Sequence, residues 1–288
     1  MVWSWLRRST LLLLWSAIVL CGGVLDTLAN GLSIAPIRLV FDGRSRVATV
    51  YLTNKSDAEA TYRILVRDKR MLETGQIVDA AEALPGERFA SDLLRFSPRR
   101  VVLGPGASQT VRVMLRNPSE GRLEHGEYRT HLVFQSVPNA PTPEELAQQD
   151  GHTVAQAIIE TSIPVIIRRD NPDAAISFTS AALDTALTKD GRPQLELVLA
   201  REGERSVYGD ITVDWIDGRG RAKTIARAVG IAVYHPTPRR HIRLPLNVPG
   251  LEALSDGRLY VRFEESALGR GDLWSDTTVD LVAERIFR

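Results

Sequence analysis

The chain has 288 residues, of which 44% are hydrophobic and 25% are charged, a composition typical of globular proteins rather than of disordered, collagen-like or disulfide-rich ones. A length of this size favours two domains of about 100–150 residues each. Because 36 basic residues are balanced by 35 acidic ones, the charge does not indicate binding to nucleic acid or to an anionic membrane surface.

Residues 1–29 have the pattern of a secretory signal peptide and are not expected to be part of the fold. Arg7 and Arg8 precede the apolar run 11–20, and Thr27-Leu28-Ala29 has the small residues of a cleavage site. We expect cleavage after Ala29 and export of the mature chain.

Two other interpretations of this leader are weaker. A membrane anchor needs about 20 apolar residues, and the run is shorter, so we expect no membrane insertion of the mature chain. Lipidation of Cys21 requires a small residue before it, and Leu20 stands there. Cleavage would remove the only cysteine, so the exported protein would depend on burial of its core rather than on disulfides.

Residues 32–135 are predicted to form short strands, because apolar and polar residues alternate between turn signals about ten residues apart. In the clearest case Val111, Val113 and Leu115 share one face while Arg112 lies on the other. This spacing, without a long helical period, is typical of an all-β sandwich. The expected strands are 32–41, 46–53, 61–67, 109–116 and 126–135.

A second sandwich is predicted after a loop and a linker. The loop at 136–151 is rich in proline and polar residues, an extended segment follows at 153–168, and Asp170-Asn171-Pro172-Asp173 has a linker composition. We therefore expect an N-terminal domain over 30–169 and a C-terminal domain over 170–288. The strands expected in the latter are 175–178, 194–200, 210–216, 225–233, 240–246, 258–263 and 277–283.

No pattern of residues indicates an enzyme. The five histidines lack the spacing of a metal motif, and the sequence has neither a nucleophile elbow nor a phosphate-binding loop. Isolated histidines of this kind are interpreted as surface residues or as hydrogen-bonded residues of the core. We expect no catalytic residue, no metal and no cofactor. The histidines are His125, His131, His152, His235 and His241.

Two arginines stand within otherwise apolar segments. Arg38 lies in the run 34–41, and Arg168 ends the run 163–168. A guanidinium that leaves water is destabilised unless it is paired and hydrogen-bonded. The pattern leaves two partners open, a carboxylate of this chain or a carboxylate that arrives with another chain.

Five segments carry a resemblance to a known family. They are LSIAPIRLVFDG (32–43), VATVYLTNKS (47–56), FSPRRVVLGPGASQTVRVMLRN (96–117), GEYRTHLVFQ (126–135) and QAIIETSIPVIIRRDNP (156–172). In order and spacing these segments resemble the periplasmic chaperones of the chaperone–usher pilus pathway. The resemblance implies two immunoglobulin-like β-sandwich domains set at an angle. It also implies donation of a β-strand to incomplete pilus or fimbrial subunits, which are then delivered to an outer-membrane usher.

The resemblance places the donor strand within residues 153–163. Ala155, Ala157 and Ile159 share one face and would enter the subunit, whereas in an alternative register Ile158 would enter instead. The alternation alone is equally compatible with an ordinary last strand of the first sandwich.

The family holds the subunit's C-terminal carboxylate between an arginine on the first strand and a lysine near the end of the donor strand. Arg38 matches the arginine, but Pro164 stands at the lysine position and has neither charge nor N–H. Arg168 or Arg169 would then be further candidates, although their family counterpart more often ties the two domains together. We also expect Pro164 to interrupt the strand ladder, as proline does except at an edge or bulge.

The alternative function is a secreted two-domain binding or adhesion module that recognises carbohydrate or protein through its loops. Aromatic platforms would favour it, and only Trp215 and Trp274 follow the signal peptide.

Overall fold

The computed structural model describes residues 31–116, 123–138, 157–184, 188–254, 257–266 and 271–281. Most of these residues lie in β-strands, with two short 3-10 helices, η1 (Ser91–Leu93) and η2 (Leu251–Leu254). Neither of these helical turns is long and apolar enough to cross a membrane, and the described residues contain no other candidate. The signal peptide expected at 1–29 lies outside the described residues, as does most of the loop expected at 136–151.

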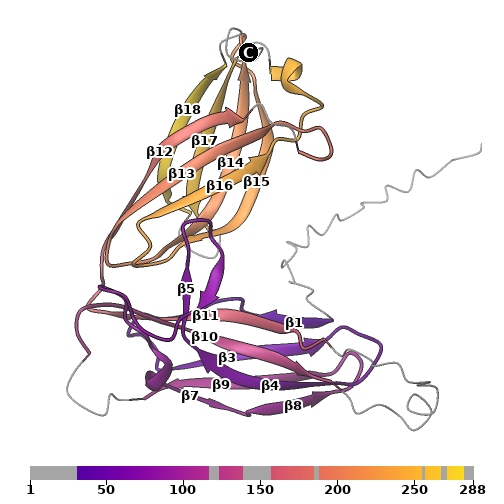
Figure 1. The fold of residues 1–288 in the computed structure, drawn as a ribbon, viewed down its shortest axis with the longest axis vertical. Helices are drawn as coiled ribbons and strands as arrows, with labels where there is room; N and C mark the ends of the chain where they lie inside the picture. The colour runs from indigo at the N-terminus through magenta and orange to yellow at the C-terminus, as the bar shows by residue number, and fades with distance from the viewer. Residues whose placement is uncertain are drawn as a thin grey trace, which may run out of the picture.

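The first half of the chain forms a sandwich of two sheets (Figure 1), with strand orders β1-β3-β9-β7 and β2-β11-β10-β4-β8. Most strands appear where alternation predicts them, because a strand with one apolar face is stable only when that face is covered, but β7 and β8 were not among the expected strands. The strands are β1 (Leu32–Ala35), β2 (Leu39–Phe41), β3 (Val47–Asn54), β4 (Ala60–Arg67), β7 (Leu94–Ser97), β8 (Arg100–Leu103), β9 (Ser108–Leu115), β10 (Gly126–Val137) and β11 (Glu160–Arg169).

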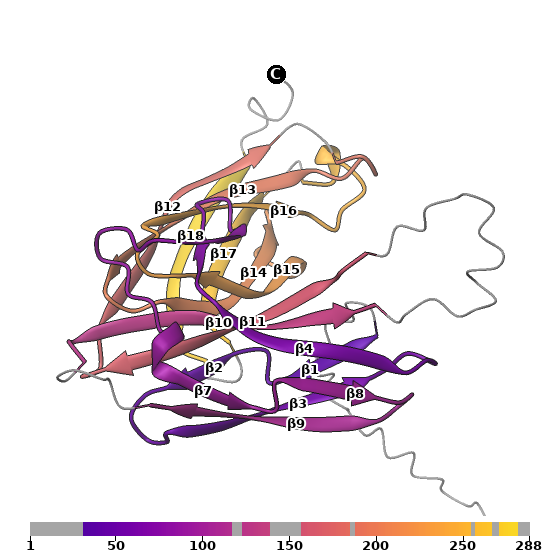
Figure 2. The same cartoon turned by 60° about the horizontal axis from the view of Figure 1, so that its bottom comes forward.

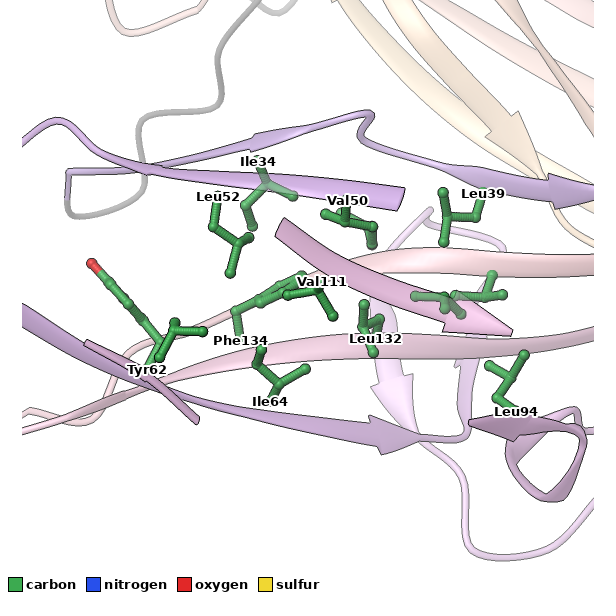
Figure 3. Packing of buried hydrophobic residues seen from close by; sticks show 14 of the residues in the cluster. Ile34, Leu39, Val50, Leu52, Tyr62, Ile64, Leu94, Val111, Leu132 and Phe134 are labelled. Carbon is green, nitrogen blue, oxygen red and sulfur yellow. The ribbon is translucent and has the colours of Figure 1, made fainter. Parts of the chain in front are cut away.

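Both sheets contribute to the core of this sandwich (Figure 3). Val50 and Val111 come from the first sheet and Ile64, Leu132 and Phe134 from the second, and all five are almost completely buried. On β9, buried Val111 and Val113 flank exposed Arg112 as predicted. Burial of this apolar surface is the main force that holds the two sheets together.

The single strand expected at 32–41 is found as two strands in different sheets. β1 pairs antiparallel with β3, whereas β2 pairs parallel with Val165–Ile167 of β11. Pro36 lies between them and has no N–H to continue a ladder, so pairing stops there and resumes on the opposite sheet. The crossover carries Arg38.

The second half forms another sandwich, with strand orders β12-β13-β16 and β15-β14-β17-β18. All seven expected strands are present, most of them longer at one or both ends than the apolar pattern indicated. They are β12 (Ala174–Asp184), β13 (Gln194–Gly203), β14 (Val207–Asp217), β15 (Ala222–Val233), β16 (Arg239–Pro245), β17 (Gly257–Glu265) and β18 (Leu273–Leu281). Its core is separate from that of the first sandwich and is formed by residues such as Leu197, Ile211 and Phe263. The protein is therefore all-β, with two immunoglobulin-like sandwiches.

A hairpin that the sequence did not indicate joins the two sandwiches. β5 (Lys69–Met71) and β6 (Ile77–Asp79) pair only with each other and extend from the first sandwich to the second (Figures 1 and 2). The Thr237 hydroxyl donates to the Met71 carbonyl at 2.8 Å, and the His241 N–H donates to the Glu73 carbonyl at 2.7 Å. The hairpin is thus bonded to the start of β16 and to the turn before it.

Candidate functional site: an open strand edge beside an interdomain arginine

One edge of β11 is only partly covered. On one side β11 pairs with β10 along its whole length, from Glu160 opposite Gln135 to Arg169 opposite Gly126. On the other side β2 pairs only with Val165–Ile167. Within the part of the chain that the structure describes, no strand covers that side of residues 157–164. An unpaired edge of this kind is a template for a strand from another chain.

The direction of the backbone groups shows which residues line this edge. In an antiparallel ladder, successive residues point their N–H and C=O alternately towards and away from the partner strand. The Ser136 N–H donates to the Ile159 carbonyl at 2.8 Å, so Ile159 and every second residue after it point towards β10. The backbone groups of residues 158, 160, 162 and 164 therefore point to the open side.

Pro164 does not interrupt the ladder with β10, contrary to expectation. The register runs unbroken through the pair of Pro164 and His131. The reason is that the backbone nitrogen of residue 164 faces away from β10. The ladder between β10 and β11 therefore does not use an N–H at this position, and proline is tolerated there. The open edge accordingly has backbone donors up to Ser162 and none at Pro164.

Only the later part of the predicted donor segment lies in the sheet. Residues 157–159 are in no strand, and β11 begins only at Glu160. Ile159 is partly buried, while Ile158 is 59% exposed and lines a shallow groove on the outer face with Arg63 and Val137. Ala157 is exposed, and Ala155 lies outside the described residues.

Arg38 lies where the two sandwiches meet. Its guanidinium carbon is 4.0 Å from the centre of the Tyr208 ring, which belongs to β14 of the second sandwich. Among the described residues no carboxylate forms an ion pair with it. Burial lowers the pKa of the Arg38 guanidinium, and the nearby tyrosine Tyr234 opposes that shift. The internal carboxylate that the sequence left open is not found among these residues.

Arg168, in contrast, already has its partners. Its Nε donates to Glu127 at 3.2 Å, and its Nη2 donates to the Ser206 carbonyl at 3.2 Å. Ser206 belongs to the second half of the chain, and both its N–H and its hydroxyl donate to the same carboxylate. Arg168 therefore ties the two sandwiches together. Arg169 lies 3.3 Å from the Asp170 carboxylate at the following turn.

A small apolar cluster reinforces this junction. Met71 of the hairpin and Ile166 of β11 pack against Ala232 and Tyr234 of the second sandwich, and Tyr208 lies at the border of the cluster. Because its members come from both sandwiches, their burial stabilises the junction as well as the domains. The pattern of the sequence did not point to this cluster, since its members come from six separate strands and from Tyr234, which follows β15.

His131 is a core residue rather than a surface one, but one of its ring nitrogens lacks the hydrogen bond expected of a buried histidine. Its ring is 2% exposed, its Nδ1 has no hydrogen-bond partner, and it meets the Tyr234 ring edge-on. Burial, reinforced by the positive charge of Arg129, lowers the pKa of His131 to about 3. No group of three or more metal-ligating side chains occurs among the described residues.

The two tryptophans that follow the signal peptide do not form a joint aromatic surface. Trp215 and Trp274 pack against the core of the second sandwich, and both indole N–H groups are buried. The Arg205 guanidinium also covers the Trp274 ring at 5.2 Å. A carbohydrate-stacking platform therefore finds no support in these two side chains.

Comparison with family models finds no match, and no curated protein matches in sequence. The structure is nevertheless similar to those of several chaperones of pilus and fimbrial systems. The match to the Pseudomonas aeruginosa CupB2 chaperone has 13% identity and a TM-score of 0.40, and it covers 86% of this chain and 99% of the other. The E. coli chaperone DraB matches with 13% identity and a TM-score of 0.41, over 87% and 98% of the two chains.

A third match is to a Salmonella enterica structure of the SafA pilin in complex with the SafB chaperone, with 14% identity, a TM-score of 0.41, and coverage of 87% and 96%. At these identities and TM-scores the likeness is one of fold, and a function for this chain has to rest on its own residues. In fold, the chain is similar to the two-sandwich chaperones of chaperone–usher pili over most of its length.

Proposed function

We propose that the protein is a periplasmic, non-enzymatic chaperone that binds pilus or fimbrial subunits by donating a β-strand and delivers them to an outer-membrane usher. The observation that carries the proposal is a combination of two features. The edge of β11 is open at residues 160–164, and beside the same strand stands a guanidinium without a carboxylate partner among the described residues.

The open edge has what an incomplete sandwich requires. A subunit that lacks one strand has unpaired backbone groups along an apolar groove, so it needs a row of N–H and C=O groups and apolar side chains at alternate positions. The backbone of Ile158, Glu160 and Ser162 would supply the first. Ala157 and Ile159 would supply the second, because they alternate with the outer-face residues, and Ala155 continues the same alternation.

Arg38 would then mark where the subunit ends. A C-terminal carboxylate placed beside β11 would form a charge-assisted, bidentate pair with the guanidinium. Because Pro164 has no N–H on the open side, an incoming strand could continue its ladder past Ser162 only by leaving one carbonyl without a donor. The end of the ladder and the arginine thus favour the same endpoint for the partner strand.

A pair of neighbouring isoleucines tests the donor register. The chain is co-expressed in the bacterial periplasm with any small exported β-rich proteins found to be encoded beside its gene, and complexes are recovered through a tag on the chaperone. Ile159→Asp should lower the yield of complex at least about tenfold, because it places a charge in an apolar groove. Ile158→Asp is the matched control and should leave the yield nearly unchanged, since its side chain faces the opposite way.

If Ile158→Asp lowers the yield of complex and Ile159→Asp does not, Ile158 is the residue that enters the subunit, as in the alternative register. Equal yields of complex from both variants and from the wild type would contradict strand donation by this segment.

The anchor is tested by Arg38→Ala, with Arg44→Ala as the control. Arg38 makes no hydrogen bond within the described residues, so its loss should leave the thermal stability nearly unchanged while the complex is lost. Arg44 is an exposed residue near β2 that pairs with Asp42 at 3.4 Å, and its loss should change neither quantity. Undiminished recovery of subunit with Arg38→Ala would contradict the carboxylate anchor.

A further inference from the structure

The aromatic ring under Arg38 comes from the other sandwich. Arg38 lies in the β1–β2 crossover of the first sandwich, and Tyr208 lies on β14 of the second. At 4.0 Å from the ring centre, the guanidinium is well within the range of a cation–π interaction. The electrostatic attraction between the two groups therefore acts across the junction.

The fold holds the Tyr208 ring in place. The ring borders the cluster of Met71, Ile166 and Tyr234, which restricts its rotation. On the neighbouring strand, Gly230 has a φ of 75°, and a Cβ at this position would lie only 2.9 Å from the Tyr208 hydroxyl. Glycine thus provides both the backbone conformation and the space that the ring requires.

The groups whose charges act on Arg38 are Tyr234, Arg168, Tyr208 and Glu127, and the Tyr208 ring lies against its guanidinium. The positive charge of Arg168 acts on Arg38, but Arg168 is paired with Glu127 at 3.2 Å, and the charge of Glu127 acts on Arg38 in the opposite direction. No carboxylate of the described residues fixes the Arg38 guanidinium, and the position of a second cation in the resembled family is occupied by Pro164. A guanidinium that lies over an aromatic face keeps the N–H groups of its rim available for a planar acceptor.

We propose that Tyr208 is a positioning residue for Arg38, and that it holds the guanidinium ready for an incoming carboxylate. The second sandwich thereby becomes part of the anchor. This inference rests on the proposed function, because it assumes that Arg38 receives the carboxylate end of a strand. A preorganised guanidinium loses less side-chain freedom when it binds a carboxylate. Preorganisation should therefore strengthen binding of a ligand with a charged C-terminus more than binding of the same ligand without that charge.

The experiment measures preference for a carboxylate rather than total affinity. The probes are a short synthetic peptide of alternating threonine and valine with a free C-terminal carboxylate and the same peptide with an amidated C-terminus. Dissociation constants for both are measured with the mature full chain by fluorescence polarisation. The ratio of the two constants is compared in the wild type, Tyr208→Leu, Tyr208→Phe and Arg38→Ala. Tyr208→Met replaces the leucine variant should that variant unfold.

We expect the wild type to prefer the carboxylate and Tyr208→Leu to lower that preference by about tenfold, as the loss of a partly buried cation–π contact implies. Tyr208→Phe should restore the preference, because it keeps the aromatic face, and Arg38→Ala should abolish it. A Tyr208→Leu variant that binds both peptides more weakly but with the wild-type ratio would overturn the positioning role alone. A wild type that binds the two peptides equally, or binds neither, would overturn the anchor and the positioning role together.

Discussion

Replacement of Glu127 by alanine tests whether the junction between the sandwiches depends on one buried carboxylate. Glu127 is 3% exposed and accepts hydrogen bonds from Arg168 Nε at 3.2 Å and from the Ser206 N–H at 3.1 Å, as well as from the Ser206 hydroxyl. Its removal leaves a guanidinium without its counter-charge and two donors without an acceptor. Breaking a buried pair in this way costs about 3–5 kcal/mol of unfolding free energy.

Glu196→Ala is the matched control. Glu196 contacts Arg243 Nε at 2.7 Å, which is closer than the contact of Glu127 with Arg168, but both of its partners are well exposed. Water already solvates such a pair, so its loss should cost less than about 1 kcal/mol. If the distance between the charges determined the contribution of these pairs to stability, Glu196→Ala would lower the unfolding free energy more than Glu127→Ala. If burial determines it, Glu127→Ala will have the larger effect.

Urea unfolding of the protein produced without residues 1–29 measures both losses. Far-ultraviolet circular dichroism follows the whole chain, and fluorescence follows Trp215 and Trp274, which both lie in the second sandwich. With a urea m-value of about 3 kcal/mol/M, Glu127→Ala should lower the midpoint by about 1–1.7 M, and Glu196→Ala by a small fraction of that. Equal midpoints for the two variants would refute the view that burial of the Glu127 cluster stabilises the junction.

Two further substitutions test the edge strand and the buried histidine. Pro164→Ala should change the unfolding free energy by less than about 1 kcal/mol in thermal or urea unfolding, because the added N–H points away from β10; a larger loss would mean that Pro164 has another role. The folded-state pKa of His131 is about 3, well below the ordinary 6.5, so the unfolded chain binds a proton first, and stability falls as the pH drops from about 6.5 towards 3. His131→Phe should remove up to about 1.4 kcal/mol per pH unit of that slope in melting experiments between pH 4 and 6, and an unchanged slope would contradict the assigned pKa.

Much of the secondary structure follows from local pattern alone. Alternation at Val111, Arg112 and Val113 predicts which side of β9 is buried, since side chains in a strand point alternately to the two faces. The same rule locates all seven strands of the second sandwich. It fails at residues 32–41, where Pro36 divides one apolar run between two sheets, because pairing with a distant strand decides the sheet to which each half belongs.

Part of the candidate site could likewise be predicted from local sequence, and part could not. Arg38 was identifiable from the sequence as a charge in an apolar run, since burial of a guanidinium requires an explanation. The partners of the two arginines were not identifiable, because Glu127, Ser206 and Tyr208 are distant in sequence from both.

Local sequence is enough to show that the chain folds into β-strands, where most of them lie, and which charges among them are unusual. The pairing of Arg168 with Glu127, the contact of Arg38 with an aromatic ring, and the orientation of Pro164 towards the open side follow from the folded arrangement of distant segments. Strand propensity and alternation are properties of neighbouring residues, whereas edges and charge pairs depend on which segments meet when the core is buried.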